Sequence, residues 1–154
     1  MRARLEKSRA RRAEKAARRA GTKQLRHDGI SYPSADQPED DARISSLARR
    51  IASLALDKKG ENVIILDVRG KTSYADYFVI ASGDSERQVT AMAEHVETEL
   101  RKEGLRPLGT EGTERGQWVL LDYGAVVAHL FFDEVRTFYD LEGLWTDVPR
   151  ERVA

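Results

Sequence analysis

Cysteine is absent from the 154-residue sequence. Disulfide bonds, thiolate metal sites and cysteine nucleophiles are therefore excluded, and the composition is typical of a protein from a reducing cytoplasm. The sequence also lacks any run of about 18 consecutive apolar residues, so no segment is expected to span a membrane. Its N-terminus is charged but has no apolar stretch, which is not typical of a secretory signal. We therefore expect a cytoplasmic localisation.

Net charge is also absent, because two oppositely charged parts of the chain cancel. Residues 1–26 contain eleven Lys or Arg side chains and two Glu side chains, which gives +9. The whole chain has 26 basic and 26 acidic residues, so 15 basic and 24 acidic residues follow residue 26. A basic arm is thus joined to an acidic body of charge −9. This asymmetry favours nucleic acid as the partner of the arm and a basic protein as the partner of the body.

The arm and the segment after it are poor in large apolar residues. Leu5 is the single large aliphatic residue before Leu25, so we expect residues 1–26 to be disordered or a frayed helix. Residues 27–41 contain a glycine, two prolines and several polar residues, which is typical of a linker. The sequence predicts a basic arm and linker over residues 1–41, one compact domain over residues 42–146 and a C-terminal tail over residues 147–154.

The rest of the chain consists of apolar segments with helical or strand periodicity. From Ala42 onward, apolar residues recur every three or four positions and predict a first helix. Ser85 and Gln88 have the spacing of a capping box that opens a second helix, and Gly104 has the position of its C-terminal glycine. A short last helix is expected, with Asp133 as its N-cap.

Four apolar runs rich in β-branched and aromatic residues predict strands. Two of them, residues 62–68 and 76–82, are almost wholly apolar, which is typical of strands covered on both faces. Residues 118–122 and 125–131 flank a tight Asp-Tyr-Gly turn and predict a hairpin. The order helix–strand–strand–helix–strand–strand–helix predicts an α/β (α+β) domain with helices packed on a small mixed sheet.

No group of residues has the pattern of a catalytic or metal-binding site. His27, His95 and His129 lack a second histidine or carboxylate at metal-ligand spacing, so no metal and no cofactor are expected. We interpret His129 as a hydrogen-bonded histidine of the sheet and His95 as a residue at a solvated helix edge. Paired carboxylates and a complete phosphate-binding loop are missing too. The turn over residues 83–85 leaves one alternative open, a divergent nucleotidyl transferase that binds phosphate at the start of a helix.

Strand alternation separates the side chains of the first hairpin strand into two sets. Trp118, Leu120 and Asp122 point to one face, and Val119 and Leu121 point to the other. An outward Trp118 is typical of a protein-docking surface. A Trp118 that merely closes the core is the structural alternative, and the sequence leaves both open.

Two segments resemble a known protein family. Residues 67–89, DVRGKTSYADYFVIASGDSERQV, and residues 111–145, EGTERGQWVLLDYGAVVAHLFFDEVRTFYDLEGLW, are similar to the ribosomal silencing factor family, also called Iojap, RsfS or YbeB. The resemblance extends from Ile44 to Trp145, about two-thirds of the chain. Its most specific elements are D-V-x-G-K-[ST]-S, the strand that leads into G-x-S-x-R, and the W-V-x-x-D-x-G-x-V-x-x-H hairpin followed by LEGLW.

The resemblance implies a nucleotidyltransferase-like fold that lacks the active site of that fold, and therefore no enzyme activity. It implies binding to the large ribosomal subunit at the ribosomal protein uL-fourteen, which blocks joining of the small subunit and represses translation. Organellar relatives imply an added role in large-subunit biogenesis, and a homodimer is left open for the free protein. An RNA-binding ribosome-assembly factor that acts through the basic arm remains an alternative.

The resemblance also implies which residues contact the ribosomal protein, on the hairpin and the start of the last helix. These candidate partner-binding residues are Trp118, Leu120, Asp122, Tyr123, Phe132, Glu134 and Arg136. The arm has no counterpart in typical bacterial members, and its single serine and missing apolar stripe argue against a transit peptide. We expect the arm to bind ribosomal RNA instead. The candidate RNA-binding residues are Arg9, Arg11, Arg12, Lys15, Arg18 and Arg19.

Removal of residues 1–26 is expected to weaken binding to the large subunit and to flatten its dependence on salt. Each lost phosphate contact should reduce the slope of log K against log salt concentration by about 0.7–0.9. Binding measured over a series of salt concentrations, for the full and the truncated chain, gives both slopes. An unchanged slope would show that the arm does not bind RNA.

Overall fold

The structure is a computed structural model that describes residues 38–154. The basic arm, its six candidate RNA-binding residues and residues 27–37 of the expected linker lie outside the described residues, as does His27. What the sequence predicts for them stays a prediction.

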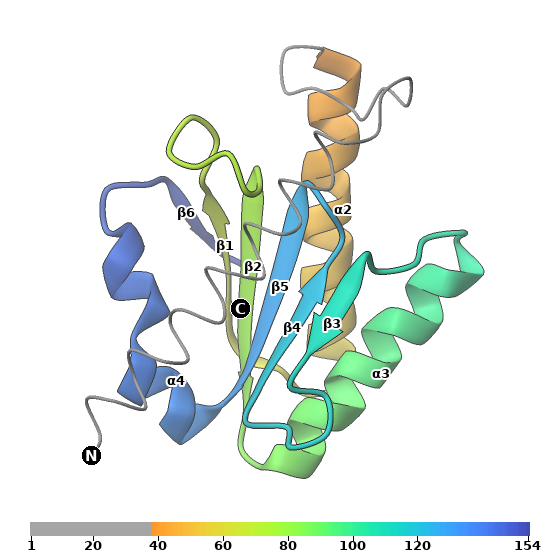
Figure 1. The fold of residues 1–154 in the computed structure, drawn as a ribbon, viewed down its shortest axis with the longest axis vertical. Coiled ribbons are helices and arrows are strands. Elements are labelled where there is room, and N and C mark those ends of the chain that lie inside the picture. The colour runs from red at the N-terminus through yellow and green to blue at the C-terminus, as the bar shows by residue number, and fades with distance from the viewer. Residues whose placement is uncertain (1–37) are drawn as a thin grey trace.

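A six-stranded mixed sheet forms the centre of the described residues (Figure 1). Its strands are β1 (Glu61–Asp67), β2 (Tyr77–Gly83), β3 (Gly109–Glu111), β4 (Trp118–Asp122), β5 (Val126–Phe132) and β6 (Arg150–Arg152). The order across the sheet is β3-β4-β5-β2-β1-β6. β2 and β5 pair in parallel, and the other neighbours pair antiparallel. The mixed sheet predicted from the sequence is confirmed.

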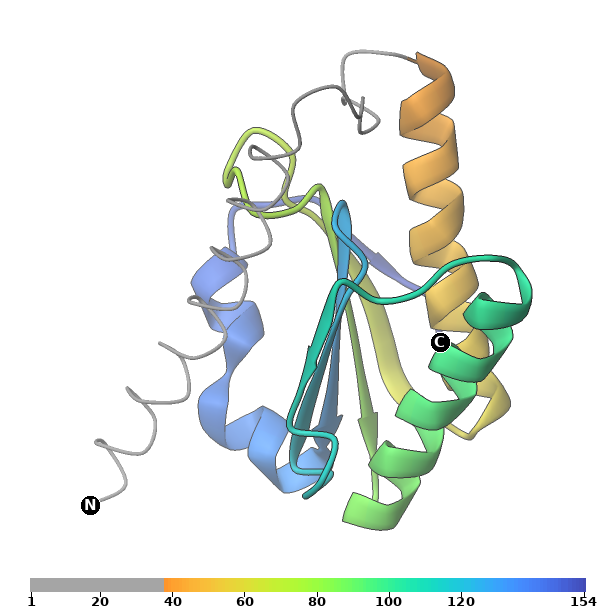
Figure 2. The same cartoon turned by 45° about the vertical axis from the view of Figure 1, so that its right-hand side comes forward.

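Helices cover both faces of the sheet (Figure 2). Helices α2 (Pro38–Asp57) and α3 (Glu86–Lys102) pack on one face, on the right of Figure 2. The shorter α4 (Asp133–Tyr139) and the 3-10 helix η1 (Leu141–Trp145) lie on the opposite face. The result is a single domain of three layers, with both long helices on one side.

Strand alternation divides the core into two clusters, one under each helical layer. Val119 and Leu121 face the α2–α3 layer and Leu120 faces the α4 layer, as the alternation predicts. All seven residues of β2 are buried, which confirms the prediction of a strand covered on both faces. The helices add fully buried side chains such as Ile51 and Leu54, each worth about 1.5–3 kcal/mol of hydrophobic stabilisation.

The predicted ends of α3 are confirmed. Ser85 is the N-cap, and its Oγ accepts a hydrogen bond from the N–H of Gln88 at 3.0 Å. The return bond of the capping box differs, because Oε1 of Gln88 accepts from the N–H of Asp84 at 2.8 Å and not from that of Ser85. Gly104 follows the helix with a φ of 84°, in the left-handed region that favours glycine.

The starts of α2 and α4 differ from the sequence prediction. α2 begins at Pro38 and not at Ala42, since a proline in the first turn gives up no helical hydrogen bond. Asp133 does not cap α4, because Phe132 holds the N-cap position and no side chain caps it. Asp133 lies in the first turn instead, where a carboxylate is stabilised by the positive end of the helix dipole.

The sequence does not predict the edge strands β3 and β6. Each has three residues, which are too few to show alternation. β6 pairs with β1 and lies within residues 147–154, the segment expected to be a tail. Val148 of that segment is also buried. The C-terminal segment is therefore part of the domain.

Gly112 and Gly70 share a φ of 76° but differ in their surroundings. A Cβ at Gly112 would overlap the carbonyl oxygen of Trp118, whereas a Cβ at Gly70 would meet no heavy atom within 4 Å. We predict that Gly112→Ala lowers the free energy of unfolding by about 1–3 kcal/mol more than Gly70→Ala does. Urea unfolding of both variants measures the difference. Equal losses would show that the close approach to Trp118 does not constrain the chain between β3 and β4.

Candidate protein-docking site

Aromatic side chains from β4, β5 and α4 meet where β4 begins. Trp118 opens β4 and lies opposite Phe131 of β5 in the antiparallel ladder. The ring centroid of Trp118 is 4.8 Å from that of Phe131 and 5.4 Å from that of Tyr139. Phe131 is buried, and Trp118 and Tyr139 are half-buried. Core packing therefore fixes an aromatic cluster that reaches the surface of the domain.

His129 lies beneath this cluster and is bonded to it. The indole Nε1 of Trp118 donates a hydrogen bond to Nδ1 of His129 at 3.1 Å. The ring of Phe78 packs edge-on against the imidazole, with centroids 5.2 Å apart. Burial among these rings lowers the pKa of His129 from 6.5 to about 3, so the imidazole is neutral at physiological pH. The prediction of a hydrogen-bonded histidine in the sheet is confirmed.

The other described histidine, His95 of α3, lies at the edge of the helical layer. Its Nε2 is 3.2 Å from Oδ2 of Asp57 in α2. Within residues 38–154, no group of three or more His, Asp or Glu side chains is placed to hold a metal ion. Among the described helices, none combines the length and the apolar character needed to cross a bilayer.

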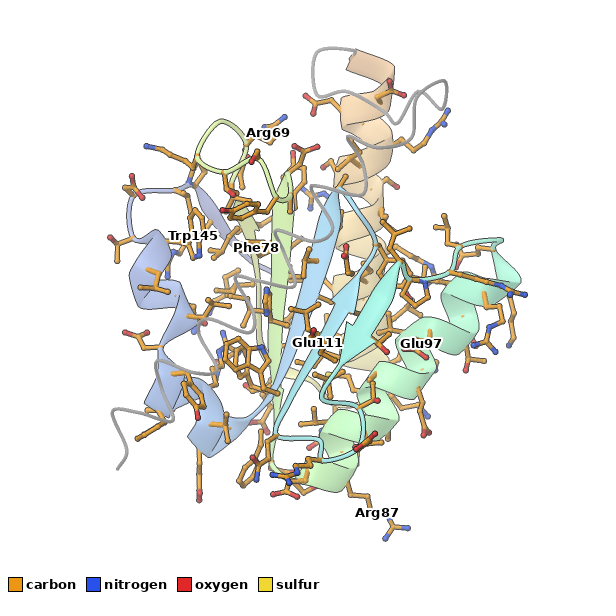
Figure 3. The ribbon with its side chains drawn as sticks, in the orientation of Figure 1. Arg69, Phe78, Arg87, Glu97, Glu111 and Trp145 are labelled. Atoms are coloured by element: carbon orange, nitrogen blue, oxygen red, sulfur yellow. The ribbon has the colours of Figure 1, made fainter. Side chains whose placement is uncertain are left out.

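A ring pair and a buried arginine are among the contacts that hold α4 and η1 on the sheet. The ring pair joins Phe78 of β2 and Trp145 of η1, whose rings meet edge to face with centroids 5.4 Å apart (Figure 3). The arginine is Arg136 of α4, which is only 8% exposed. Its Nη1 donates to Oγ of Ser82 at 3.1 Å and to the carbonyl oxygen of Glu61 at 3.4 Å.

The guanidinium of Arg136 also bonds to Glu142 of η1. Nε donates to Oε1 of Glu142 at 2.8 Å, and Nη2 donates to the same oxygen. The donors of Arg136 thus point into the domain, where they tie α4 to η1 and to the sheet. Arg136 is therefore a positioning residue for α4, which differs from the predicted contact with the partner.

Two more of the candidate residues lie on the opposite side of the sheet from Trp118. Tyr123 and Phe132 are half-buried and pack against the α2–α3 core. The hydroxyl of Tyr123 is buried and has no hydrogen-bond partner among the described residues. Burial raises the pKa of this hydroxyl, because the phenolate would lose its hydration. A single flat partner surface cannot contact these residues and Trp118 together.

Asp122 and Leu120 face the α4 side but are buried. Asp122 is 6% exposed, and its Oδ1 accepts from the N–H of Gly124 at 2.8 Å, which shapes the β4–β5 turn. Leu120 belongs to the core cluster beneath α4. Of the seven candidates, Trp118 and Glu134 reach the surface on this side of the sheet. Their contact with a partner stays a prediction.

α4 and η1 also expose apolar side chains that are not among the seven candidate residues. Leu144 is 67% exposed and Phe138 is 37% exposed. The exposed charged residues over 133–145 are Asp133, Glu134 and Asp140, all acidic. Leu144 belongs to the LEGLW segment, but the sequence does not show which of the apolar residues there faces outward. We define the α4–η1 surface as Trp118, Glu134, Phe138, Tyr139 and Leu144.

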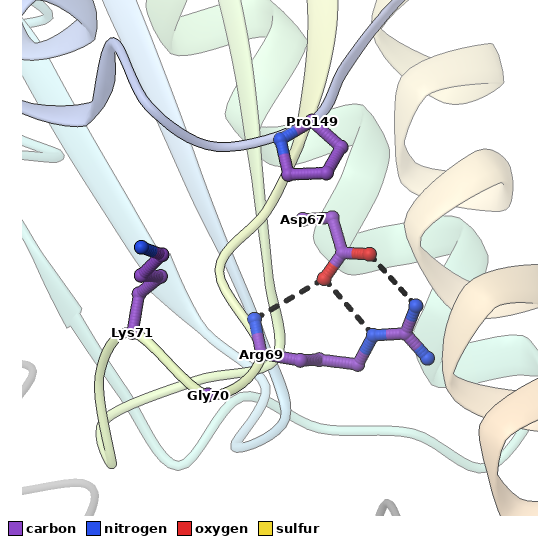
Figure 4. A pocket seen from close by; sticks show the side chains of 5 residues that line it. All are labelled: Asp67, Arg69, Gly70, Lys71 and Pro149. Atoms are coloured by element: carbon purple, nitrogen blue, oxygen red, sulfur yellow. Dashed lines mark hydrogen bonds and ion pairs between the residues drawn. The ribbon is translucent and has the colours of Figure 1, made fainter.

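Charged side chains of the D-V-R-G-K-T-S element form bonds within the domain (Figure 4). The carboxylate of Asp67 accepts from Nε of Arg69 at 2.9 Å and from Nη2 at 2.7 Å, and these bonds lower the pKa of Asp67. Nη1 of Arg69 donates to Asp41 of α2 at 2.7 Å. Lys71 pairs with Asp147 at 3.0 Å, which ties the same loop to the segment before β6. Asp67, Arg69 and Lys71 of the element are thus each bonded to charged groups of the same domain.

The turn over residues 83–85 is likewise occupied by internal contacts. Besides its two bonds at the start of α3, Gln88 donates from Nε2 to the carbonyl oxygens of Lys58 and Lys59, at 3.0 and 2.9 Å. These bonds join α3 to the end of α2. A phosphate bound at this turn would therefore compete with Ser85 and Gln88 for the N–H groups at the start of α3.

Comparison with known protein families shows to which family this chain belongs. The family described as "Ribosomal silencing factor during starvation" matches residues 41–154, well over half of the chain. The chain belongs to the ribosomal silencing factor family. The resemblance drawn from the sequence is thereby confirmed. The match begins inside α2 and continues through β6, so the silencing-factor domain includes the C-terminal segment.

Two relatives carry the name ribosomal silencing factor RsfS. The protein of Bacillus subtilis is 38% identical over 104 residues, which cover 68% of this chain and 88% of the relative. The protein of Chromobacterium violaceum is 43% identical over 101 residues, which cover 63% and 83%. A crystal structure of a Chromobacterium violaceum protein has a TM-score of 0.62 at 39% identity, over 73% of this chain and 92% of that one. The silencing-factor domain described here thus has the fold of a solved relative.

His129 is expected to make the stability of the silencing-factor domain depend on pH. The unfolded chain protonates this histidine near pH 6.5 and the folded domain only near pH 3, so acid favours unfolding within this window. At about pH 5 the buried imidazole should cost about 2 kcal/mol of stability relative to neutral pH.

His129→Asn keeps an acceptor for Trp118 but removes the titrating group. The variant should lose this part of the pH dependence, which urea unfolding at pH 5 and at neutral pH measures. If the variant and the wild type show the same pH dependence, His129 takes up its proton in the folded domain and is not sealed from solvent.

Proposed function

We propose that this protein binds the large ribosomal subunit at the ribosomal protein uL-fourteen and blocks joining of the small subunit. Translation is repressed because the two subunits cannot form a ribosome. Membership of the ribosomal silencing factor family supports the ribosomal setting. The identity of the partner rests on the resemblance of the hairpin and the LEGLW segment to that family.

The observation that carries the proposal is the α4–η1 surface. Leu144 and Phe138 are exposed apolar residues of η1 and α4, and the half-buried ring of Tyr139 in α4 contacts that of Trp118 in β4. Gathered exposed apolar residues are typical of protein-binding sites, and tryptophan and tyrosine are enriched at their centres. Because core packing already fixes these rings, docking requires little rearrangement.

The charge of the domain suits a basic protein partner. Residues 38–154 contain 15 Lys or Arg side chains and 22 Asp or Glu side chains. Asp133, Glu134 and Asp140 add exposed negative charge beside the apolar residues of the α4–η1 surface. Ribosomal proteins are basic, so opposite charges meet at the proposed interface, whereas bare RNA would repel the domain.

The domain blocks joining of the subunits by its volume. A domain of about 100 residues has a radius of gyration near 13 Å. A typical specific interface covers about 800 Å² of each partner. A domain of this size, docked where the subunits meet, leaves no room for the small subunit at that point. No chemical step is needed, which agrees with a family named for silencing ribosomes.

Two further partners belong to the proposal. Ribosomal RNA is the partner of the basic arm over residues 1–26, because its charge of +9 favours phosphate contacts. A second copy of the chain is the partner of the free protein, because an uncovered apolar surface favours self-association. An added role in large-subunit biogenesis uses the same binding to the large subunit.

Leu144→Glu is expected to weaken binding to the large subunit by about tenfold or more, since it places a charge among the apolar residues of the interface. Leu144 is 67% exposed, so the fold should persist. Ala91→Glu is the matched control on the exposed side of α3, across the sheet, and should bind as the wild type does. Co-sedimentation with purified large subunits measures both variants. Equal binding by Leu144→Glu and the wild type would remove the α4–η1 surface from the proposal.

A further inference from the structure

A second pair of exposed apolar residues lies away from the α4–η1 surface. Leu105 and Leu108, in the loop between α3 and β3, are 41% and 39% exposed. They line a cavity of about 640 Å³, which we call the α2–α3 pocket. The proposed docking to the ribosome makes no use of this pocket, because its walls include α2 and α3, which lie on the face of the sheet opposite α4 and η1.

Five segments enclose the α2–α3 pocket, one of which is the loop after α3 that carries Leu105 and Leu108. α2 contributes Ile44 and Leu47, and the end of α3 contributes Leu100. The β4–β5 turn and the loop between β1 and β2 close the pocket from the sheet. The β4–β5 turn, the loop between β1 and β2 and the loop after α3 lie at the same end of the sheet (Figures 1 and 2). Together with Leu105 and Leu108, these residues make the walls largely aliphatic.

Three arginines and two acidic residues, Asp76 and Glu103, line the pocket, so its lining has a net charge of +1 although the domain as a whole is acidic. Arg43 of α2 and Arg106 of the loop after α3 both line it, and among the described residues neither is held in an ion pair. Arg50 lines it too, but its Nε is paired with Glu103 at 3.2 Å. Asp76, in the loop between β1 and β2, lines the pocket as well.

We propose that the α2–α3 pocket binds a small anion with an aliphatic body, of the class of medium-chain carboxylates. The aliphatic chain packs between Leu47, Leu105 and Leu108. The carboxylate accepts hydrogen bonds from the guanidinium groups of Arg43 and Arg106, since charge-assisted bonds of this kind are strong and directional. Asp76 keeps the anionic group away from the loop between β1 and β2.

The size and shape of the pocket favour a small molecule as its occupant. Small-molecule sites commonly measure about 300–1,000 Å³ and have apolar walls with a few polar groups that fix orientation. A peptide in a helical conformation requires a long apolar groove with anchor positions along it. The α2–α3 pocket is a half-open pocket of about 640 Å³, a volume that suits a small molecule.

The test uses the full-length protein and sodium decanoate below its micelle-forming concentration, followed by two-dimensional amide NMR spectra. We expect saturable shifts at Leu105, Leu108 and Ala125. Arg106→Gln should weaken decanoate binding by about tenfold or more, because a charge-assisted bond is lost. Arg87→Gln, at the exposed arginine near the other end of α3 (Figure 3), is the matched control and should bind as the wild type does.

Decanol has the same chain without the charge, and it should bind at least about tenfold more weakly than decanoate. Leu105→Asp is a second variant that should abolish binding, with thermal unfolding as the check that it folds. The proposal is overturned if decanol binds as tightly as decanoate, if the shifts centre on the α4–η1 surface, or if an acidic peptide binds and decanoate does not. Leu144→Glu should keep decanoate binding, so failure of this proposal is distinct from failure of ribosome binding.

Discussion

The parallel pairing of β2 with β5 determines where the other parts of the domain lie. Seven pairs in register, from Tyr77–Val126 to Gly83–Phe132, place these two strands at the centre of the sheet. A parallel pair needs a long connection, and here α3, β3 and β4 provide it. Because β5 ends at the same end of the sheet as β2, α4 begins there and returns over the face opposite α3 (Figure 2). The docking surface and the pocket both follow from this arrangement.

The two helical layers are unequal, and each leaves a different kind of surface. α2 and α3 have 20 and 17 residues, whereas α4 and η1 have 7 and 5. The short layer is anchored by the buried Arg136, yet the rings of Trp118 and Tyr139 beside it stay half-buried. The long layer leaves an aliphatic cavity between the first half of α2 and the end of α3. One sheet thus carries an exposed apolar surface on one face, which we propose to bind a protein, and on the other face a pocket that we propose to bind a small molecule.

Sequence reasoning succeeded where the signal is local and failed where it depends on distant groups. Strand β2, the β4–β5 hairpin and the N-cap of α3 are present as predicted. The sequence predicts Arg136 as a partner contact, but the groups that bind it, Ser82 and the carbonyl of Glu61, are 54 and 75 residues away in the chain. Phe132 was predictable, because alternation from Phe131 places it on the face opposite the tryptophan. Leu144 was not, since nothing local shows which side of η1 meets the sheet.

The central claim is that this silencing-factor domain acts by occupying a surface and transforms no substrate. The most direct measurement saturates purified large subunits with the protein, adds small subunits, and determines the joined fraction on a sucrose gradient. We predict that the joined fraction falls in step with occupancy of the large subunit and reaches background at saturation. Normal joining by large subunits that carry the protein would contradict the claim.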